Sequence, residues 1–199
     1  MQTVLVSLPM VVPADHVPGP LQGCWTYDDY AAIPEDGKRY EVVDGVLYIM
    51  PGPNTGHQTA AVNFTTFLTI HVRFSGKGRV FAAPYDVELG PGDVVQPDVV
   101  VVLSANLGII TASRIIGAPD LVVEIASPGT ATHDRRKKQD AYARAGVPEY
   151  WIADPYAHTI ELLCLEGDAY RSIGVFAGQS TLPSLVIPDL PVRVEQFFA

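Results

Sequence analysis

Hydrophobic and polar positions along the chain predict short strands interrupted by a few helices. The clearest helical repeat lies in residues 57–74, where Ala61, Phe64 and Leu68 recur at three- and four-residue spacing before Ser75-Gly76. Strand-like alternation on both sides of Asp44-Gly45, in RYEVVDGVLYIM, predicts a hairpin. Helical and extended segments both occur, which indicates a domain of the α plus β kind.

Several further elements follow from the same patterns. Thr26 and Asp29 form a capping-box-like start to a short helix. Residues 104–118 are ambiguous and suit a loop with a short helix. The remaining apolar segments predict strands at 79–89 and 97–103, a hairpin of 149–154 with 159–165, a strand at 169–176, and a proline-punctuated tail at 183–198 that wraps the domain edge.

Residues 120–154 predict a strand, a turn, a helix and a strand in succession. The apolar run 121–126 is bounded by proline and glycine, as in a strand buried on both faces. Thr130 or Thr132 suits the cap of a helix that runs to Gly146. Glu124 lies within the strand, where an unpartnered carboxylate costs several kcal/mol.

The helix of this segment has one packed face. Asp134, Lys138, Ala141, Tyr142 and Ala145 share it at helical spacing, whereas Arg135, Arg136, Lys137 and Gln139 spread over the others. Lys138 is therefore the basic residue of the run RRKK that points inward. Because a helix that follows a strand packs back over the sheet, we expect Lys138 to approach Glu124.

Composition sets the limits of the molecule. A chain of 199 residues with 48% hydrophobic content suits a single domain, which we expect over residues 26–199 after an N-terminal arm at 1–25. The prolines of the arm interrupt any span of membrane length. Cys24 and Cys164 lack metal-like spacing and predict ordinary thiols in a cytoplasmic protein. The net charge of −9 excludes a protein that coats nucleic acid with its whole surface.

Three acids interrupt apolar strand patterns: Glu41, Asp98 and Glu124. Gathered in one place, they would repel one another unless a divalent cation lay between them. Oxygen ligands favour magnesium or manganese over zinc. A nearby lysine could orient an attacking water or offset charge on a phosphoryl oxygen.

These motifs resemble a known family. Pro97-Asp98, the strand-borne Glu124 and a nearby lysine resemble the PD-(D/E)xK nuclease superfamily, whose core is a mixed β-sheet flanked by helices. More closely, the chain from about Thr26 to at least Leu165 resembles the Uma2 family (the DUF820 group) of restriction-endonuclease-like proteins. The stretches that carry this resemblance are RYEVVDGVLYIM, HQ at 57–58, QPDVVVV, PDLVVEIASPGT, the Asp134/Lys138/Tyr142 helix and AGVPEYWIADP.

The resemblance implies a restriction-endonuclease-like α/β (α+β) fold and a metal-dependent phosphodiesterase site. Asp98 and Glu124 would be the core ligands of Mg²⁺ or Mn²⁺, and Glu41 a further acid that binds directly or through water. The superfamily's usual lysine, two residues after the glutamate, is replaced here by Ala126. The Uma2-like pattern supplies a lysine from the following helix instead, which matches Lys138.

The function implied is that of an endonuclease that hydrolyses nucleic-acid phosphodiester bonds. The expected partner is nucleic acid, with DNA considered first, although the sequence does not distinguish DNA from RNA or indicate sequence specificity. A homodimer through the tail or the arm is a further hypothesis. On this interpretation Asp98→Ala or Lys138→Ala abolishes cleavage and leaves the fold intact. The alternatives are an inactive module of the same fold that binds nucleic acid or protein, and a paired-carboxylate hydrolase of the glycosidase kind.

Each candidate residue also has a structural interpretation. Glu41 suits a solvated edge position by periodicity, and Asp98 suits the cap of a turn. Glu124 and Lys138 could form a buried pair without chemistry. Tyr142 suits packing, and His57 with Gln58 suits either the cleft or an ordinary surface or core position. The run 135–137 suits a solvated face, with phosphate contact as the alternative.

Overall fold

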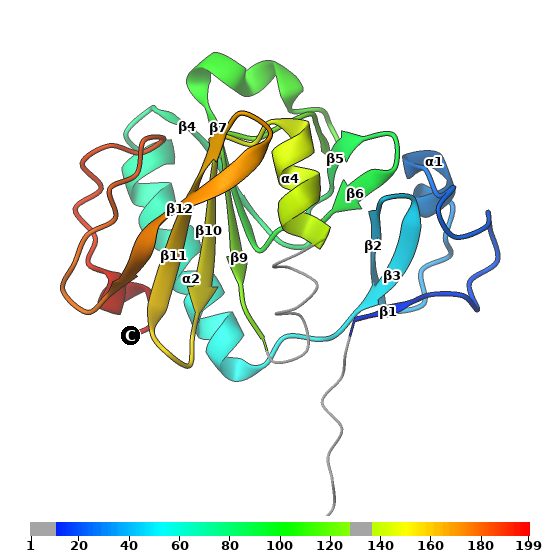
Figure 1. Ribbon diagram of the computed structural model, residues 1–199, viewed down its shortest axis with the longest axis horizontal. Helices are drawn as coiled ribbons and strands as arrows, with labels where there is room; N and C mark the ends of the chain where they lie inside the picture. The colour runs from blue at the N-terminus through cyan, green and yellow to red at the C-terminus, as the bar shows by residue number, and fades with distance from the viewer. Residues whose placement is uncertain (1–10, 128–136) are drawn as a thin grey trace, which may run out of the picture.

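Two six-stranded sheets form the framework of the protein, for which the computed structural model describes residues 11–127 and 137–199 (Figure 1). The first sheet has the order β1-β3-β2-β6-β5-β8, with β1 (Val12–Pro13), β2 (Arg39–Val43), β3 (Val46–Met50), β5 (Val87–Gly90), β6 (Asp93–Val95) and β8 (Ile115–Ile116). The second has the order β12-β11-β10-β9-β7-β4, with β4 (Gly78–Ala82), β7 (Val99–Leu103), β9 (Leu121–Ile125), β10 (Glu149–Asp154), β11 (Thr159–Glu166) and β12 (Ala169–Ala177). Each sheet is mixed, because β5 with β8 and β9 with β10 pair in parallel among antiparallel neighbours.

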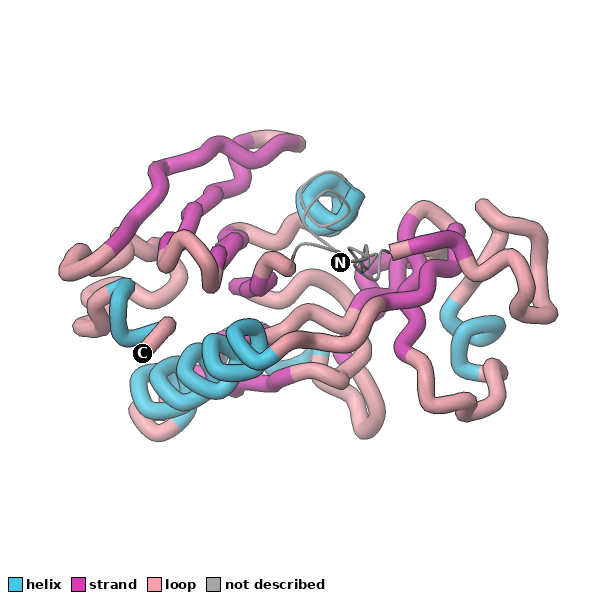
Figure 2. Tube along the Cα trace, turned by 90° about the horizontal axis from the view of Figure 1, so that it is seen from below, coloured by secondary structure: helices cyan, strands magenta, loops and turns pink. Residues whose placement is uncertain are grey.

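The helical segments are α1 (Tyr27–Ala31), α2 (Thr55–Leu68) with its π-helical continuation η1 (Thr69–Arg73), the 3-10 turns η2 (Ser104–Ile109) and η4 (Val194–Phe197), and α4 (Gln139–Ala145). Helices α2 and α4 lie on opposite faces of the second sheet (Figure 2). None of the helices in the described part of the chain is long and apolar enough to cross a membrane.

Strand alternation explains how both faces of the second sheet are covered. Val99 and Val101 of β7 pack toward α2 and the C-terminal tail, where Phe64 stacks on Phe197 at 4.2 Å between ring centroids. The alternating residues Val100 and Val102 pack toward α4 and the first sheet. The second sheet is therefore buried on both sides, as the continuous valine run predicts.

Most predicted elements are confirmed. The hairpin turns at Asp44 and Gly45 with φ angles of 54° and 69°, which suit a two-residue turn. The capping box of Thr26 and Asp29 is present, and α4 ends at Gly146 with a φ of 87°. The expected caps Thr130 and Thr132, and Asp134, Arg135 and Arg136, lie outside the described residues.

One expectation about the strands needs correction. The single strand expected at 79–89 is two strands in different sheets, β4 and β5, because Pro84 lies between them and cannot donate to a strand ladder. The strands form two sheets, and the segment around Asp93 adds a short strand, β6, to the first. Residues 11–25 of the expected arm pack on that sheet, where β1 pairs with β3 and Trp25 is buried.

Candidate active site

Lys138 lies between two buried carboxylates from different sheets. Its Nζ atom is 2.6 Å from Oε1 of Glu124 on β9 and 3.1 Å from Oε1 of Glu41 on β2. Lys138 is 1% exposed, Glu41 0% and Glu124 4%. The inward direction predicted for Lys138 is confirmed, whereas the solvated edge position considered for Glu41 is wrong.

Local geometry explains why these side chains meet. Glu124 shares a face of β9 with Val122, which packs toward α4 and the first sheet. Glu41 shares a face of β2 with Val43, which belongs to the same core cluster. Lys138 stands one turn before Tyr142 of α4, so both point into the space between the two sheets.

Tyr142 fixes the orientation of Glu124. Its Oη atom donates a hydrogen bond of 2.5 Å to Oε1 of Glu124, and the side chain is fully buried. Burial, reinforced by the nearby charge of Glu124, raises the pKa of the Tyr142 phenol well above its ordinary value. Tyr142 therefore remains a donor at neutral pH and holds the carboxylate in addition to packing in the core.

Asp98 stands at the entrance to β7 and is tied to two other elements. Its Oδ2 atom accepts a hydrogen bond of 2.8 Å from the backbone N–H of Ile125, next to Glu124. Nε2 of His57, in the first turn of α2, lies 3.1 Å from the same oxygen. Asp98 therefore connects the neighbouring strands β7 and β9, whereas its sequence context also suited the cap of a turn. His57 belongs to the site.

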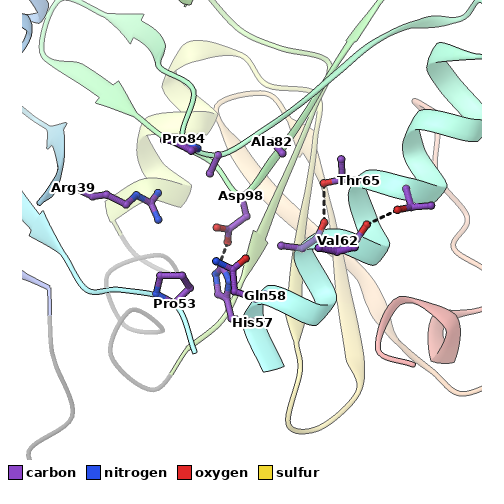
Figure 3. A pocket seen from close by; sticks show the side chains of 12 residues that line it. Arg39, Pro53, His57, Gln58, Val62, Thr65, Ala82, Pro84 and Asp98 are labelled. Carbon is purple, nitrogen blue, oxygen red and sulfur yellow. Dashed lines mark hydrogen bonds and ion pairs between the residues drawn. The ribbon is translucent and has the colours of Figure 1, made fainter. Parts of the chain in front are cut away.

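The four predicted site residues line one small cavity. Glu41, Asp98, Glu124 and Lys138 surround a space of about 30 Å³, together with His57 and Arg39. A larger pocket of about 480 Å³ adjoins it and shares Arg39, Pro53, His57 and Asp98 in its lining. Figure 3 shows Arg39 on one side of this pocket and Val62 and Thr65 of α2 on the other, with His57 and Asp98 between them.

Arg39 is held beside the cavity by Gln96. Nε of Arg39 donates to Oε1 of Gln96 at 3.2 Å, and Nη2 donates to the backbone oxygen of Gln96 at 3.4 Å. Nε2 of Gln96 donates to Asp86 and to the hydroxyl of Tyr30. The backbone N–H of Gln96 donates to Oε1 of Glu41 at 2.9 Å. Arg39 and Glu41 thus share one positioning residue.

The oxygen donors of the cavity suit a hard cation. Among residues 11–127 and 137–199, Oε2 of Glu41 is buried without a hydrogen-bond partner. The three carboxylates that line the cavity outnumber its two cationic side chains, Lys138 and Arg39. Within the same residues, no three His, Cys, Asp or Glu side chains are grouped to hold a metal as they stand. Magnesium commonly takes only one or two carboxylates, with waters and substrate oxygens completing its shell, so the donors fit such an ion.

Sequence analysis missed the contributions of Arg39 and Gln96. Arg39 precedes Glu41 by two residues, and this spacing places both side chains on one face of a strand. Gln96 precedes Asp98 by two residues at the start of an extended segment. Both two-residue spacings can be read in the sequence. They did not single out a functional site, because arginine and glutamine at strand ends are common on protein surfaces.

Comparison with known proteins identifies the family. A family model named Uma2, whose description is "Putative restriction endonuclease", matches residues 27–195. The chain belongs to the Uma2 family. A crystal structure of "a putative nuclease belonging to DUF820" from Anabaena variabilis has a similar fold, with a TM-score of 0.71 and 20% sequence identity over 87% of this chain and 97% of that chain. No curated protein matches the sequence.

The expected restriction-endonuclease-like fold class is thereby confirmed. In this Uma2 protein, position 126 on the strand side is alanine, and Lys138, directly before α4, places its ammonium group beside Glu124. The catalytic and metal-binding roles of Glu41, Asp98, Glu124 and Lys138 stay predictions.

Proposed function

We propose that this protein is an endonuclease that hydrolyses nucleic-acid phosphodiester bonds with Mg²⁺ or Mn²⁺. The observation that carries the proposal is the convergence of Asp98, Glu124, Glu41 and Lys138 on one cavity beside a pocket open to substrate. Membership of a family described as "Putative restriction endonuclease" supports the same class of reaction.

Each residue of the cavity has a role in this proposal. Asp98 and Glu124 would hold the cation, with Glu41 assisting directly or through water. A bound divalent cation would neutralise the scissile phosphate and lower the pKa of the attacking water. His57 and the backbone of Ile125 orient Asp98, and Tyr142 orients Glu124.

Lys138 and Arg39 supply positive charge at different places. The ammonium group of Lys138, fixed by two carboxylates, can orient the attacking water or stabilise charge that develops on the phosphoryl oxygens. The guanidinium of Arg39, held by Gln96, lies at the junction of the cavity with the larger pocket and suits a phosphate oxygen.

Manganese binding is the first test. Calorimetry on the wild-type chain should detect binding that Asp98→Ala removes, with folding monitored by circular dichroism. Asp168→Ala is the matched control, because Asp168 is exposed in the turn between β11 and β12. Wild-type and Asp168→Ala chains should then cleave oligonucleotides when Mg²⁺ or Mn²⁺ is added and stop when it is chelated.

Cleavage that persists in Asp98→Ala would overturn the assignment. Absence of both manganese binding and cleavage in the wild-type chain would favour a module that binds nucleic acid or protein without hydrolysis. In that module the Lys138 interactions with Glu41 and Glu124 would be structural ion pairs.

A further inference from the structure

The pocket lined by His57, Val62 and Thr65 of α2, called the α2 pocket below, lies directly beside the proposed metal cavity. It occupies about 480 Å³ between α2 and the connection from β4 to β5, and its floor includes His57 and Asp98 (Figure 3). This volume falls within the range of roughly 300–1,000 Å³ that pockets for small organic groups occupy. A group bound there would lie next to a phosphate held at the carboxylates.

The walls of the pocket combine apolar surface with a few polar groups. Val62, which is 63% exposed, and Pro84 present apolar faces, and Gln58 and Thr65 add hydrogen-bonding groups. Such a lining suits the flat, weakly polar faces and polar edges of a nucleobase.

Charge distinguishes this pocket from a second one of similar size. A pocket of about 520 Å³ on the other side of Arg39 is lined by three acids, Glu35, Asp36 and Asp86, and by the two cations Lys38 and Arg39. Within the α2 pocket the charged lining residues are Arg39 and Asp98, and Asp98 faces the proposed cation. A polyanion therefore meets less repulsion in the α2 pocket.

Arg39 links the pocket to the cavity. Its guanidinium is fixed by two hydrogen bonds to Gln96 and lies in the lining of both spaces. A phosphate beside Arg39 would have one neighbouring nucleotide directed toward Val62 and Thr65. Bases in an intact duplex are stacked and paired in its interior, so a base reaches such a pocket only from an unpaired strand or after leaving the stack.

We propose that the α2 pocket receives one unpaired nucleotide next to the scissile phosphate, so that the preferred substrate is single-stranded or locally unpaired nucleic acid. This inference rests on the proposed nuclease function and adds the class of substrate to it. Arg39 holds the phosphate, the apolar wall contacts the face of the base, and Gln58 and Thr65 approach its edge.

The experiment compares three oligonucleotides of one sequence: a single strand, a full duplex, and a duplex with one unpaired nucleotide. Cleavage is measured with Mn²⁺, and binding is measured independently by fluorescence anisotropy without added metal. The wild-type chain should cleave and bind the single strand and the interrupted duplex about tenfold or more better than the full duplex.

Thr65→Trp tests the pocket itself, and Thr59→Trp on the same helix is the matched control. Thr65 lines the pocket, whereas Thr59 is exposed and does not line it. Thr65→Trp should reduce binding and kcat/KM for the single strand about tenfold or more, through a raised KM, and Thr59→Trp should resemble the wild type. Circular dichroism checks that both variants are folded.

The outcomes separate the two proposals. Equal cleavage and binding of the full duplex and the single strand, or equal behaviour of the two tryptophan variants, would overturn the pocket assignment even if cleavage occurs. Selective binding of the single strand that only Thr65→Trp weakens, without cleavage of any substrate, would uphold the pocket and overturn the nuclease function.

Discussion

Nζ of Lys138 lies 2.6 Å from Oε1 of Glu124, within a site where both side chains are almost completely buried. The same ammonium group reaches Glu41 on the first sheet, so one lysine at the N-terminal end of α4 contacts both sheets. Buried charges of this kind are strongly interdependent, because removal of one partner leaves the other unpaired in a medium of low dielectric constant.

Replacement of Lys138 by methionine should therefore destabilise the fold as well as stop cleavage. The variant leaves Glu41 and Glu124 close together without their shared cation, and we expect a loss of about 3–5 kcal/mol in the free energy of unfolding. This revises the expectation that Lys138→Ala leaves the fold intact. Urea unfolding at neutral pH measures the change.

Arg144→Ala is the control on the same helix. Arg144 contacts Asp44 and Asp93, but its side chain is 48% exposed, so its loss should cost less than about 1 kcal/mol. The double variant Glu124→Gln/Lys138→Met should be more stable than Lys138→Met alone, because it removes one of the two carboxylates that repel each other once Lys138 is lost. Equal stability of Lys138→Met and Arg144→Ala would contradict this account of the site.

Tyr142→Phe should lower the free energy of unfolding, although it keeps the packed ring and removes only the hydroxyl. The phenol donates a hydrogen bond to a carboxylate, and its removal should cost about 1.5–3 kcal/mol. Urea unfolding detects the change, and Tyr156→Phe is a control because Tyr156 is 67% exposed. An unchanged unfolding midpoint in Tyr142→Phe would show that the hydrogen bond contributes no net stability.

Alkaline pH should lower the free energy of unfolding through Tyr142. Burial raises the pKa of Tyr142, and also those of Tyr30 and Tyr170, above their ordinary value. Their contribution to stability is complete below the pKa of an unfolded tyrosine, about 10, and decreases as pH rises above it, because the unfolded chain then loses protons that the folded chain retains. Unfolding measured from pH 8 to 11 should show this decline, with a smaller slope in Tyr142→Phe. Equal slopes for that variant and the wild type would exclude the contribution of Tyr142.

Gln96→Leu should impair substrate binding through Arg39. The substitution removes the side-chain acceptor for Nε of Arg39 and the donor to Asp86 and Tyr30, while leaving the backbone contact to Glu41. Without this hydrogen bond the guanidinium is more mobile, so it loses more conformational entropy when it binds phosphate. We therefore expect KM to rise about tenfold, while kcat changes less than about twofold. Steady-state kinetics on a single-stranded substrate separate these constants. A lowered kcat at constant KM would instead place the effect on the chemical step.

Glu149→Ala should destabilise the C-terminal tail without affecting manganese binding. The buried carboxylate accepts hydrogen bonds from Nε1 of Trp151 and from the backbone of Leu185 and Val186. Three donors lose their acceptor, and we expect a cost of about 3 kcal/mol in urea unfolding. Glu195→Ala, which removes an exposed partner of Arg193, should cost less than about 1 kcal/mol. Equal losses in the two variants would contradict a specific role for Glu149.

Local signals in the sequence determined much of the framework. The helical period identified the inward position of Lys138, and the Asp44-Gly45 turn fixed the hairpin that carries Glu41. Proline before the valine run placed Asp98 at the entrance to a buried strand. These features depend on residues within a few positions of one another, so periodicity and turn chemistry suffice to predict them.

Only the tertiary structure decided how these elements combine. The burial of Glu41 depends on Lys138, which is 97 positions away, and on a second layer that packs over β2. His57 meets Asp98 across 41 positions, and Arg39 meets Gln96 across 57. The sequence by itself thus determined the elements, the family resemblance and the candidate acids. The division into two sheets, the sharing of one lysine by two carboxylates and the pocket beside α2 arise from long-range packing, because a strand's own period does not reveal which layer covers each of its faces.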